Sequence, residues 1–210
     1  MTNSLRLKDL SLAALLLCGA GCAPKIYRFD VLPYTLCVGT KAVVTWQIEG
    51  TPELTLTPDA SPVSTQPLTY APLVETKFVL HAKHGGAQAT SSTSVTVYPA
   101  SGIGANNMVF NTTCAGNALT AVVNRPPTEW DPRIRVKRVS SDQGRNLTIA
   151  HEGRTATLTT AAPSTTAFDG TSIAGTWNLT APLQVNEQCS DPKAPPLTLV
   201  RLTHHIVCSK

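Results

Sequence analysis

Short runs of alternating apolar and polar residues recur along most of the chain, with turn residues between them. In residues 42–48 (AVVTWQI), Val44, Trp46 and Ile48 fall on one face. The same alternation places further apolar residues on expected core faces: Leu54 and Leu56; Phe78, Leu80 and Ala82; Val95 and Val97. A period of two predicts half-buried strands, and no run of a dozen residues has a helical period. We therefore predict an all-β chain built of β-sandwiches.

A segment of small residues divides the chain into two parts. The strand-like run VTVYP ends at Pro99, and residues 100–105 (ASGIGA) have the composition of a linker. We expect a first domain over residues 26–99 and a second over residues 106–210. The second part contains seven candidate strands of its own: 107–113, 118–123, 134–139, 147–151, 155–160, 175–185 and 197–207. Both domains are thus predicted to be β-structure.

The N-terminus differs from the rest of the chain in its pattern. Arg6 and Lys8 precede an apolar run from Leu10 to Leu17, and small residues follow it. This three-part layout is typical of a secretory signal peptide, here residues 1–21. The run is well short of the roughly 20 residues that span a bilayer as a helix. Export is therefore favoured over a transmembrane anchor.

Residues 19–22 (GAGC) resemble the lipobox of bacterial lipoproteins, although Gly19 stands where Leu is commonest. The resemblance implies cleavage before Cys22, acylation of that residue and attachment to a membrane through the lipid. Since Ala23 is not the Asp that retains lipoproteins in the inner membrane, it also implies the outer membrane, with the protein periplasmic or surface-exposed. Two alternatives stay open: cleavage without lipid, which leaves Cys22 an ordinary thiol, and a buried N-terminal strand.

Two further resemblances concern the domains. The succession of VVTWQIEG, LTLTP, ETKFVLHAKHGG and SVTVYP resembles a bacterial immunoglobulin-like module, with Trp46 in its core. Residues 168–182 (FDGTSIAGTWNLTAP) resemble late strands of the jelly-roll P domain that follows some subtilisin-like proteases. This second resemblance implies a core position for Trp177 and a jelly-roll-like second sandwich. Such immunoglobulin-like modules serve as spacers or adhesive units, so the resemblance implies architecture more than activity.

Four cysteines remain in the mature chain besides Cys22, and an oxidising compartment favours their pairing. Three connectivities are possible. In a regular final hairpin, Cys189 lies near the tip and Cys208 at the far end, beyond the 7 Å Cα limit of a disulfide. A last strand antiparallel to the first would return Cys208 to the domain junction. We therefore predict Cys37–Cys208, joining the two domains, and Cys114–Cys189.

Composition narrows the choice of partners. Only 14% of the residues are charged and the net charge is +4, without the interleaved basic and aromatic residues of a nucleic-acid surface. We predict no nucleic-acid partner. The single basic cluster is Arg133, Arg135, Lys137 and Arg138, in which alternation puts three cations on one strand face. A solvated face is the simplest interpretation, and attraction to anionic lipid headgroups or lipopolysaccharide is the alternative.

The chain carries no motif for catalysis, metal binding or phosphate binding. His204 and His205 are adjacent in a predicted strand, so they point to opposite faces and cannot chelate one metal together. His81 and His84 flank a turn, where a weak metal site is conceivable but exposed turn residues are simpler. Ser172 lacks the spacing of a nucleophile elbow. We predict no cofactor, no metal site and no catalytic residues.

These features favour a non-catalytic, membrane-anchored envelope lipoprotein. Its sandwiches would present surfaces to an envelope protein, a glycan or an envelope polymer. The alternative is a secreted or anchored enzyme, or an enzyme subunit, with a site built on loops from Asp131, Asp142, His151 and Asp169. Carboxylates of this kind can also hold a structural Ca²⁺.

Overall fold

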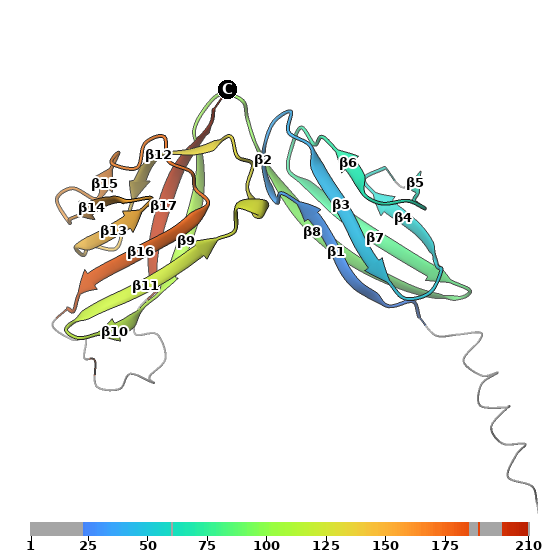
Figure 1. Cartoon of the computed structure of the whole chain (residues 1–210), viewed down its shortest axis with the longest axis horizontal. Coiled ribbons are helices and arrows are strands. Elements are labelled where there is room, and N and C mark those ends of the chain that lie inside the picture. Colours follow the sequence, from blue (N-terminus) through green and yellow to red (C-terminus); the bar gives the residue numbers. More distant parts are fainter. Residues whose placement is uncertain (1–22, 60, 185–188, 190–198, 210) are drawn as a thin grey trace, which may run out of the picture. The chain divides into compact units, whose positions relative to one another are not determined.

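The computed structural model describes residues 23–59, 61–184, 189 and 199–209. The predicted signal peptide and Cys22 lie outside these residues. Within them the chain is all-β apart from one short 3₁₀ helix, η1 (Pro127–Glu129), as Figure 1 shows. No helix in this part of the chain has the length and apolarity needed to span a bilayer. The prediction of an all-β fold is confirmed.

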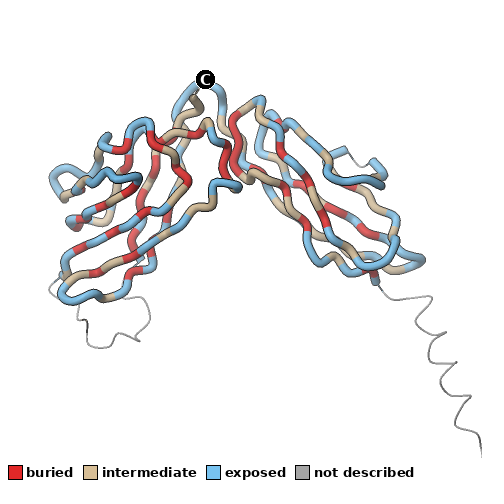
Figure 2. The backbone as a smooth tube through the Cα atoms, viewed as in Figure 1, coloured by how far each residue is buried: buried red, intermediate tan, exposed pale blue. Residues whose placement is uncertain are grey.

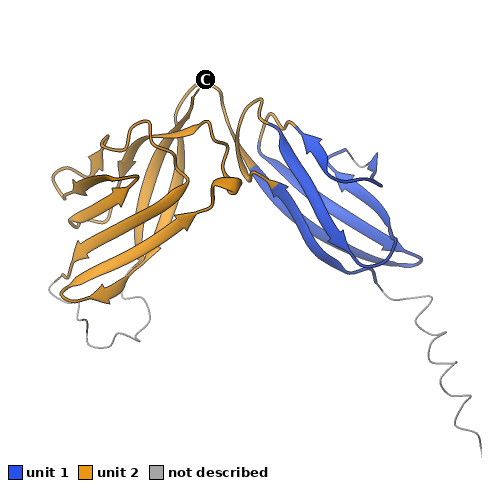
Figure 3. Ribbon diagram, in the orientation of Figure 1, with its two compact units in different colours: residues 1–31, 41–70, 75–95 blue, residues 32–40, 71–74, 96–210 orange. Residues whose placement is uncertain are grey.

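The strands belong to two compact units (Figure 3). Among the described residues, unit 1 comprises residues 23–31, 41–70 and 75–95. Unit 2 comprises residues 32–40, 71–74 and 96–209. The division falls within strand β8 (Ala87–Tyr98), a few residues before the predicted linker, and the next strand, β9 (Gly104–Asn111), begins inside that linker.

Unit 1 is built from antiparallel strands in two sheets. One sheet has the order β1-β3-β6, and the other has the order β8-β7-β4-β5. The strands are β1 (Ile26–Leu32), β3 (Ala42–Ile48), β4 (Glu53–Thr57), β5 (Ser61–Pro62), β6 (Leu68–Tyr70), β7 (Thr76–His84) and β8 (Ala87–Tyr98). A short strand β2 (Thr35–Cys37) pairs in parallel with the last three residues of β8. This is the immunoglobulin-like strand order, in which the first and last strands lie in different sheets.

The core of unit 1 follows the alternation seen in the sequence (Figure 2). Val44 and Trp46 are buried on β3, and Phe78 and Leu80 are buried on β7. Each buried side chain of this size contributes about 1.5–3 kcal/mol by leaving water. Ile48 departs from the expected pattern because it is only half-buried.

Unit 2 is a jelly roll. Its strands are β9 (Gly104–Asn111), β10 (Thr113–Ala115), β11 (Ala118–Arg125), β12 (Ile134–Ser140), β13 (Leu147–His151), β14 (Arg154–Leu158), β15 (Ser164–Thr165), β16 (Gly175–Pro182) and β17 (Leu199–Cys208). One sheet has the order β9-β17-β12-β15, and the other has the order β10-β11-β16-β13-β14. Without the short edge strand β10, these are the two four-stranded sheets of a double Greek key.

The two sheets of unit 2 enclose one apolar core. Trp177 on β16 is fully buried at its centre and meets Phe168 edge-on at 5.2 Å between ring centroids. Ile134 and Val136 on β12 face the same core. The predicted core position of Trp177 is therefore confirmed.

Two disulfides join the partners that the sequence analysis expects. Cys37 pairs with Cys208 at a Cα separation of 5.8 Å, and Cys114 pairs with Cys189 at 5.5 Å. Cys37 lies in the segment 32–40 that belongs to unit 2. The first disulfide therefore closes unit 2 and does not join two separate units, contrary to the expectation that it bridges two domains. Each bond stabilises the fold by roughly 2–4 kcal/mol.

Candidate functional site

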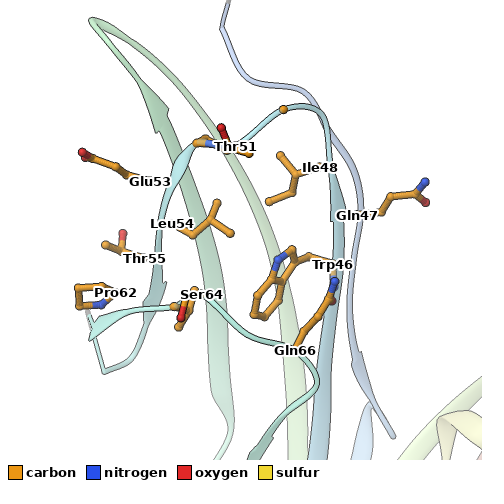
Figure 4. A pocket seen from close by; sticks show the side chains of 13 residues that line it. Trp46, Gln47, Ile48, Thr51, Glu53, Leu54, Thr55, Pro62, Ser64 and Gln66 are labelled. Carbon is orange, nitrogen blue, oxygen red and sulfur yellow. The ribbon is translucent and has the colours of Figure 1, made fainter.

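A cavity of about 720 Å³ opens at one end of unit 1, between β3, β4 and the segment 62–66 (Figure 4). Its inner wall is apolar because Trp46, Ile48 and Leu54 point into it from the facing strands. Hydroxyl and amide side chains, including Ser64 and Gln66, lie around the opening. We call this cavity the Trp46 pocket.

The pocket exists because β3 extends past its partner strand. β6 pairs with β3 only from Ala42 to Val44. Beyond that point the backbone N–H of Trp46 donates instead to Oε1 of Gln66, at 2.8 Å. The strand β3 then turns into β4 through Gly50, whose φ of 74° is a left-handed conformation that glycine adopts without strain. The unpaired end of the sandwich remains open, which explains the half-buried state of Ile48.

The lining of the Trp46 pocket is mostly apolar. Its volume falls in the range of ligand-binding pockets, about 300–1,000 Å³. Among the described residues that line it, Glu53 is the only ionisable one, and in Figure 4 its side chain points away from the interior. The wall offers apolar surface with a few hydrogen-bonding groups, which suits an uncharged ligand or a partner's side chain. It offers no acid–base pair.

Asp131 is a structural residue of unit 2. Its buried carboxylate accepts hydrogen bonds from the Cys37 backbone N–H at 2.9 Å, from the Thr40 hydroxyl and from Arg133. Burial raises the pKa of Asp131, but the hydrogen bonds from Arg133, Thr40 and the backbone outweigh it and lower the pKa overall. The carboxylate thus fixes the segment containing Cys37 to the start of β12.

The other three members of the proposed loop-built site have separate environments. Asp169 pairs with Lys137 at 2.7 Å, and Asp142 is exposed. His151 is buried, with its ring nitrogens at 2.9 Å from the Thr176 carbonyl and 2.7 Å from the Ser172 carbonyl. Over the described part of the chain, no three His, Cys, Asp or Glu side chains gather closely enough to hold a metal ion. The structure does not bring the four residues together.

The adjacent histidines point to opposite faces of β17, as predicted. His204 is fully buried, whereas His205 is half-exposed. His81 and His84 are both exposed on β7. The prediction that His204 and His205 cannot bind one metal together follows directly from this arrangement.

His204 belongs to a buried ring stack that the sequence did not indicate. The Trp177 ring lies parallel to His151 at 3.8 Å and edge-on to His204 at 4.5 Å. Neither ring nitrogen of His204 has a hydrogen-bond partner among the described residues. Burial and the nearby charges of Arg125 and His151 lower the pKa of His204 from 6.5 to about 3. His204 is therefore a neutral core residue at pH 7.

The comparisons with known proteins do not assign a family. Neither a scan against protein-family models nor a search of curated proteins finds a match.

Proposed function

We propose that this protein is an exported bacterial envelope lipoprotein without catalytic activity, anchored in the outer membrane through acylated Cys22. Its two sandwiches present a binding surface to another envelope component, with the protein on the periplasmic or the surface-exposed side. The Trp46 pocket is the binding site that its geometry supports best. Its partner is an envelope protein, a glycan or an envelope polymer.

The observation that carries the proposal is the complete pairing of the downstream cysteines. Cys37, Cys114, Cys189 and Cys208 are all in disulfides. Disulfides persist mainly outside the reducing cytoplasm. Pairing leaves Cys22, in its lipobox-like setting, as the one cysteine of the mature chain that is available for acylation.

Fatty-acid labelling in a Gram-negative host tests the anchor. We expect the wild-type protein to incorporate labelled palmitate and to fractionate with the outer membrane. Cys22→Ala should abolish both, while Cys18→Ala, which changes a cysteine of the signal peptide, should leave both intact. Label that persists in Cys22→Ala, or a wild-type protein found wholly in the soluble periplasm, would contradict the proposal.

Site-specific photo-crosslinking tests the pocket. A photoreactive residue replaces Ser64 at the pocket opening and, as a control, exposed Ser92 on β8. In intact cells we expect a discrete crosslinked product from position 64 and none of the same mass from position 92. Identical products at both positions, or none at either, would show that the pocket is not the contact site.

A further inference from the structure

The strands of one sheet of the jelly roll carry basic but no acidic side chains. Strands β9, β12, β15 and β17, which form one sheet of unit 2, contain no Asp or Glu. Their inward side chains are buried in the core, so the charged side chains lie on the outer surface. We call the outer surface formed by Arg135, Arg138, Arg201 and His205 the basic face.

The basic face differs from the basic cluster expected from the sequence. Arg133 does not belong to the basic face, because its guanidinium pairs with Asp131 and donates a hydrogen bond to the Cys37 carbonyl. Lys137 lies at a β-bulge between Val136 and Arg138 and pairs with Asp169. Two of the expected cations therefore have carboxylate partners, and the alternation of three cations is interrupted.

Three arginines remain without a carboxylate. The bulge places Arg138 opposite His205 on β17, and Arg201 joins from the same strand. Within the described residues, no carboxylate lies within ion-pair distance of Arg135, Arg138 or Arg201. His205 responds to this charge: partial burial and then the positive charge of Arg138 lower its pKa. The basic face thus has three guanidinium charges at neutral pH.

The register sets the spacing of these charges. Arg135 is opposite Val207, two pairs beyond the Arg138–His205 pair, and Arg201 is four residues before His205. At about 3.3 Å per residue, the backbone positions of the three arginines are about 7 Å and about 13 Å apart along the strands. A single small anion cannot contact all three. An extended partner with repeated negative groups can.

Hydroxyl and amide side chains lie between Arg138 and Arg201, while exposed Val109 stands opposite Arg201. Ser140 and Thr203 are cross-strand neighbours there, and Thr203 donates to Asn107 at 3.0 Å. No aromatic residue projects from these positions. Single-stranded nucleic acid is bound with stacking aromatic side chains, and interfacial membrane helices insert apolar side chains into the bilayer. Hydroxyls, amides and guanidinium forks instead match the hydroxyls and carboxylates of sugars.

We propose that the basic face binds an extended acidic polysaccharide, whose repeated carboxylates pair with Arg135, Arg138 and Arg201. This inference goes beyond the anchor and the Trp46 pocket and depends on neither. The pairs are solvent-exposed, so the affinity is modest and falls with salt.

Binding of polygalacturonate to the purified full-length protein in detergent tests the inference. We expect saturable binding at low salt that 0.5 M NaCl abolishes, and no binding of neutral dextran. The triple variant Arg135→Gln, Arg138→Gln and Arg201→Gln should bind at least about tenfold more weakly, the equivalent of three exposed charge pairs. Arg201→Gln alone should retain the fold and bind about twofold to threefold more weakly.

A second triple variant tests whether binding depends on the basic face or only on the net charge of the protein. This control replaces Lys41, Lys77 and Lys83 with Gln and so removes the same charge from unit 1. It should leave binding within twofold of the wild type. Equal losses in the two triple variants would overturn the proposal, as would equal binding of dextran or no binding at all. Stronger binding to phosphatidylglycerol vesicles than to polygalacturonate, lost in the arginine variant, would assign the face to a membrane surface and also overturn it.

Discussion

His204 predicts a specific loss of stability in mild acid. The folded protein holds this residue neutral, with a pKa of about 3, whereas the unfolded chain protonates it near 6.5. Between these values the unfolded state binds the extra proton, so the free energy of unfolding falls as the pH falls from 6.5 towards 3. Above pH 6.5 the contribution is fully present.

The size of the effect follows from the gap between the two pKa values. The gap corresponds to about 5 kcal/mol at full protonation and to about 2 kcal/mol between pH 7 and pH 5. Asp131 also has a lowered pKa, but its contribution is lost only below its ordinary pKa of 3.8. Between pH 7 and pH 5, therefore, the change in the free energy of unfolding reports the histidines and not Asp131.

The informative change is His204→Leu. It removes two buried nitrogens without partners and keeps a side chain of similar size, so we expect stability within about 1 kcal/mol of the wild type at pH 7. At pH 5 the variant should be more stable than the wild type by about 2 kcal/mol. Urea unfolding in a Trp46→Phe background reports unit 2 alone, because the other two tryptophans belong to it.

The half-exposed neighbour supplies the control. His205→Gln should change the dependence on pH far less than His204→Leu, since His205 is only partly buried. If the wild type and His204→Leu lose the same stability between pH 7 and pH 5, the assignment of His204 as a neutral core residue is refuted. Greater acid sensitivity in His204→Leu would refute it as well.

Three other stability predictions concern unit 2. Replacing both cysteines of the β2–β17 disulfide with Ser should lower the free energy of unfolding by about 2–5 kcal/mol, measured by urea unfolding against the wild type with its disulfides intact. Asp131→Ala leaves the buried Cys37 N–H without its acceptor and the half-exposed Arg133 guanidinium without its carboxylate partner, so it should cost about 1–3 kcal/mol in the same assay. Gly104→Ala would place a β-carbon against the Tyr98 ring and should lower stability by about 1–3 kcal/mol, whereas Gly86→Ala, which meets open space, should change it by less than about 0.5 kcal/mol. Equal effects of the two glycine changes would contradict the overlap at Tyr98.

Local patterns sufficed for much of the fold. The alternation of Val44 and Trp46 depends only on the pleat of a strand, and it gave the core face of β3 correctly. The pairing of Cys37 with Cys208 is as predicted, and the premise that the last strand runs antiparallel to the first strand of unit 2 is correct. The premise of a regular final hairpin is wrong, because β16 and β17 lie in different sheets and do not pair.

Features that depend on distant partners could not be predicted in the same way. Ile48 has the alternation of a core residue, but whether it is covered depends on where β6 stops pairing with β3. The charge of the basic face depends on a bulge in β12 and on Asp169, which lies 32 residues from Lys137. The burial of His204 likewise depends on Trp177 in the opposite sheet. Alternation alone does not specify these long-range contacts.

Mass spectrometry of the N-terminus tests the proposed anchoring most directly. Trypsin releases residues 22–25 (CAPK) from a mature chain that begins at Cys22. We predict this tetrapeptide with diacylglycerol on the Cys22 sulfur and, in hosts that add it, a third acyl chain on the amino group. Detection of residues 9–25 as one unmodified peptide, or of a processed chain with an unacylated Cys22, would contradict the account.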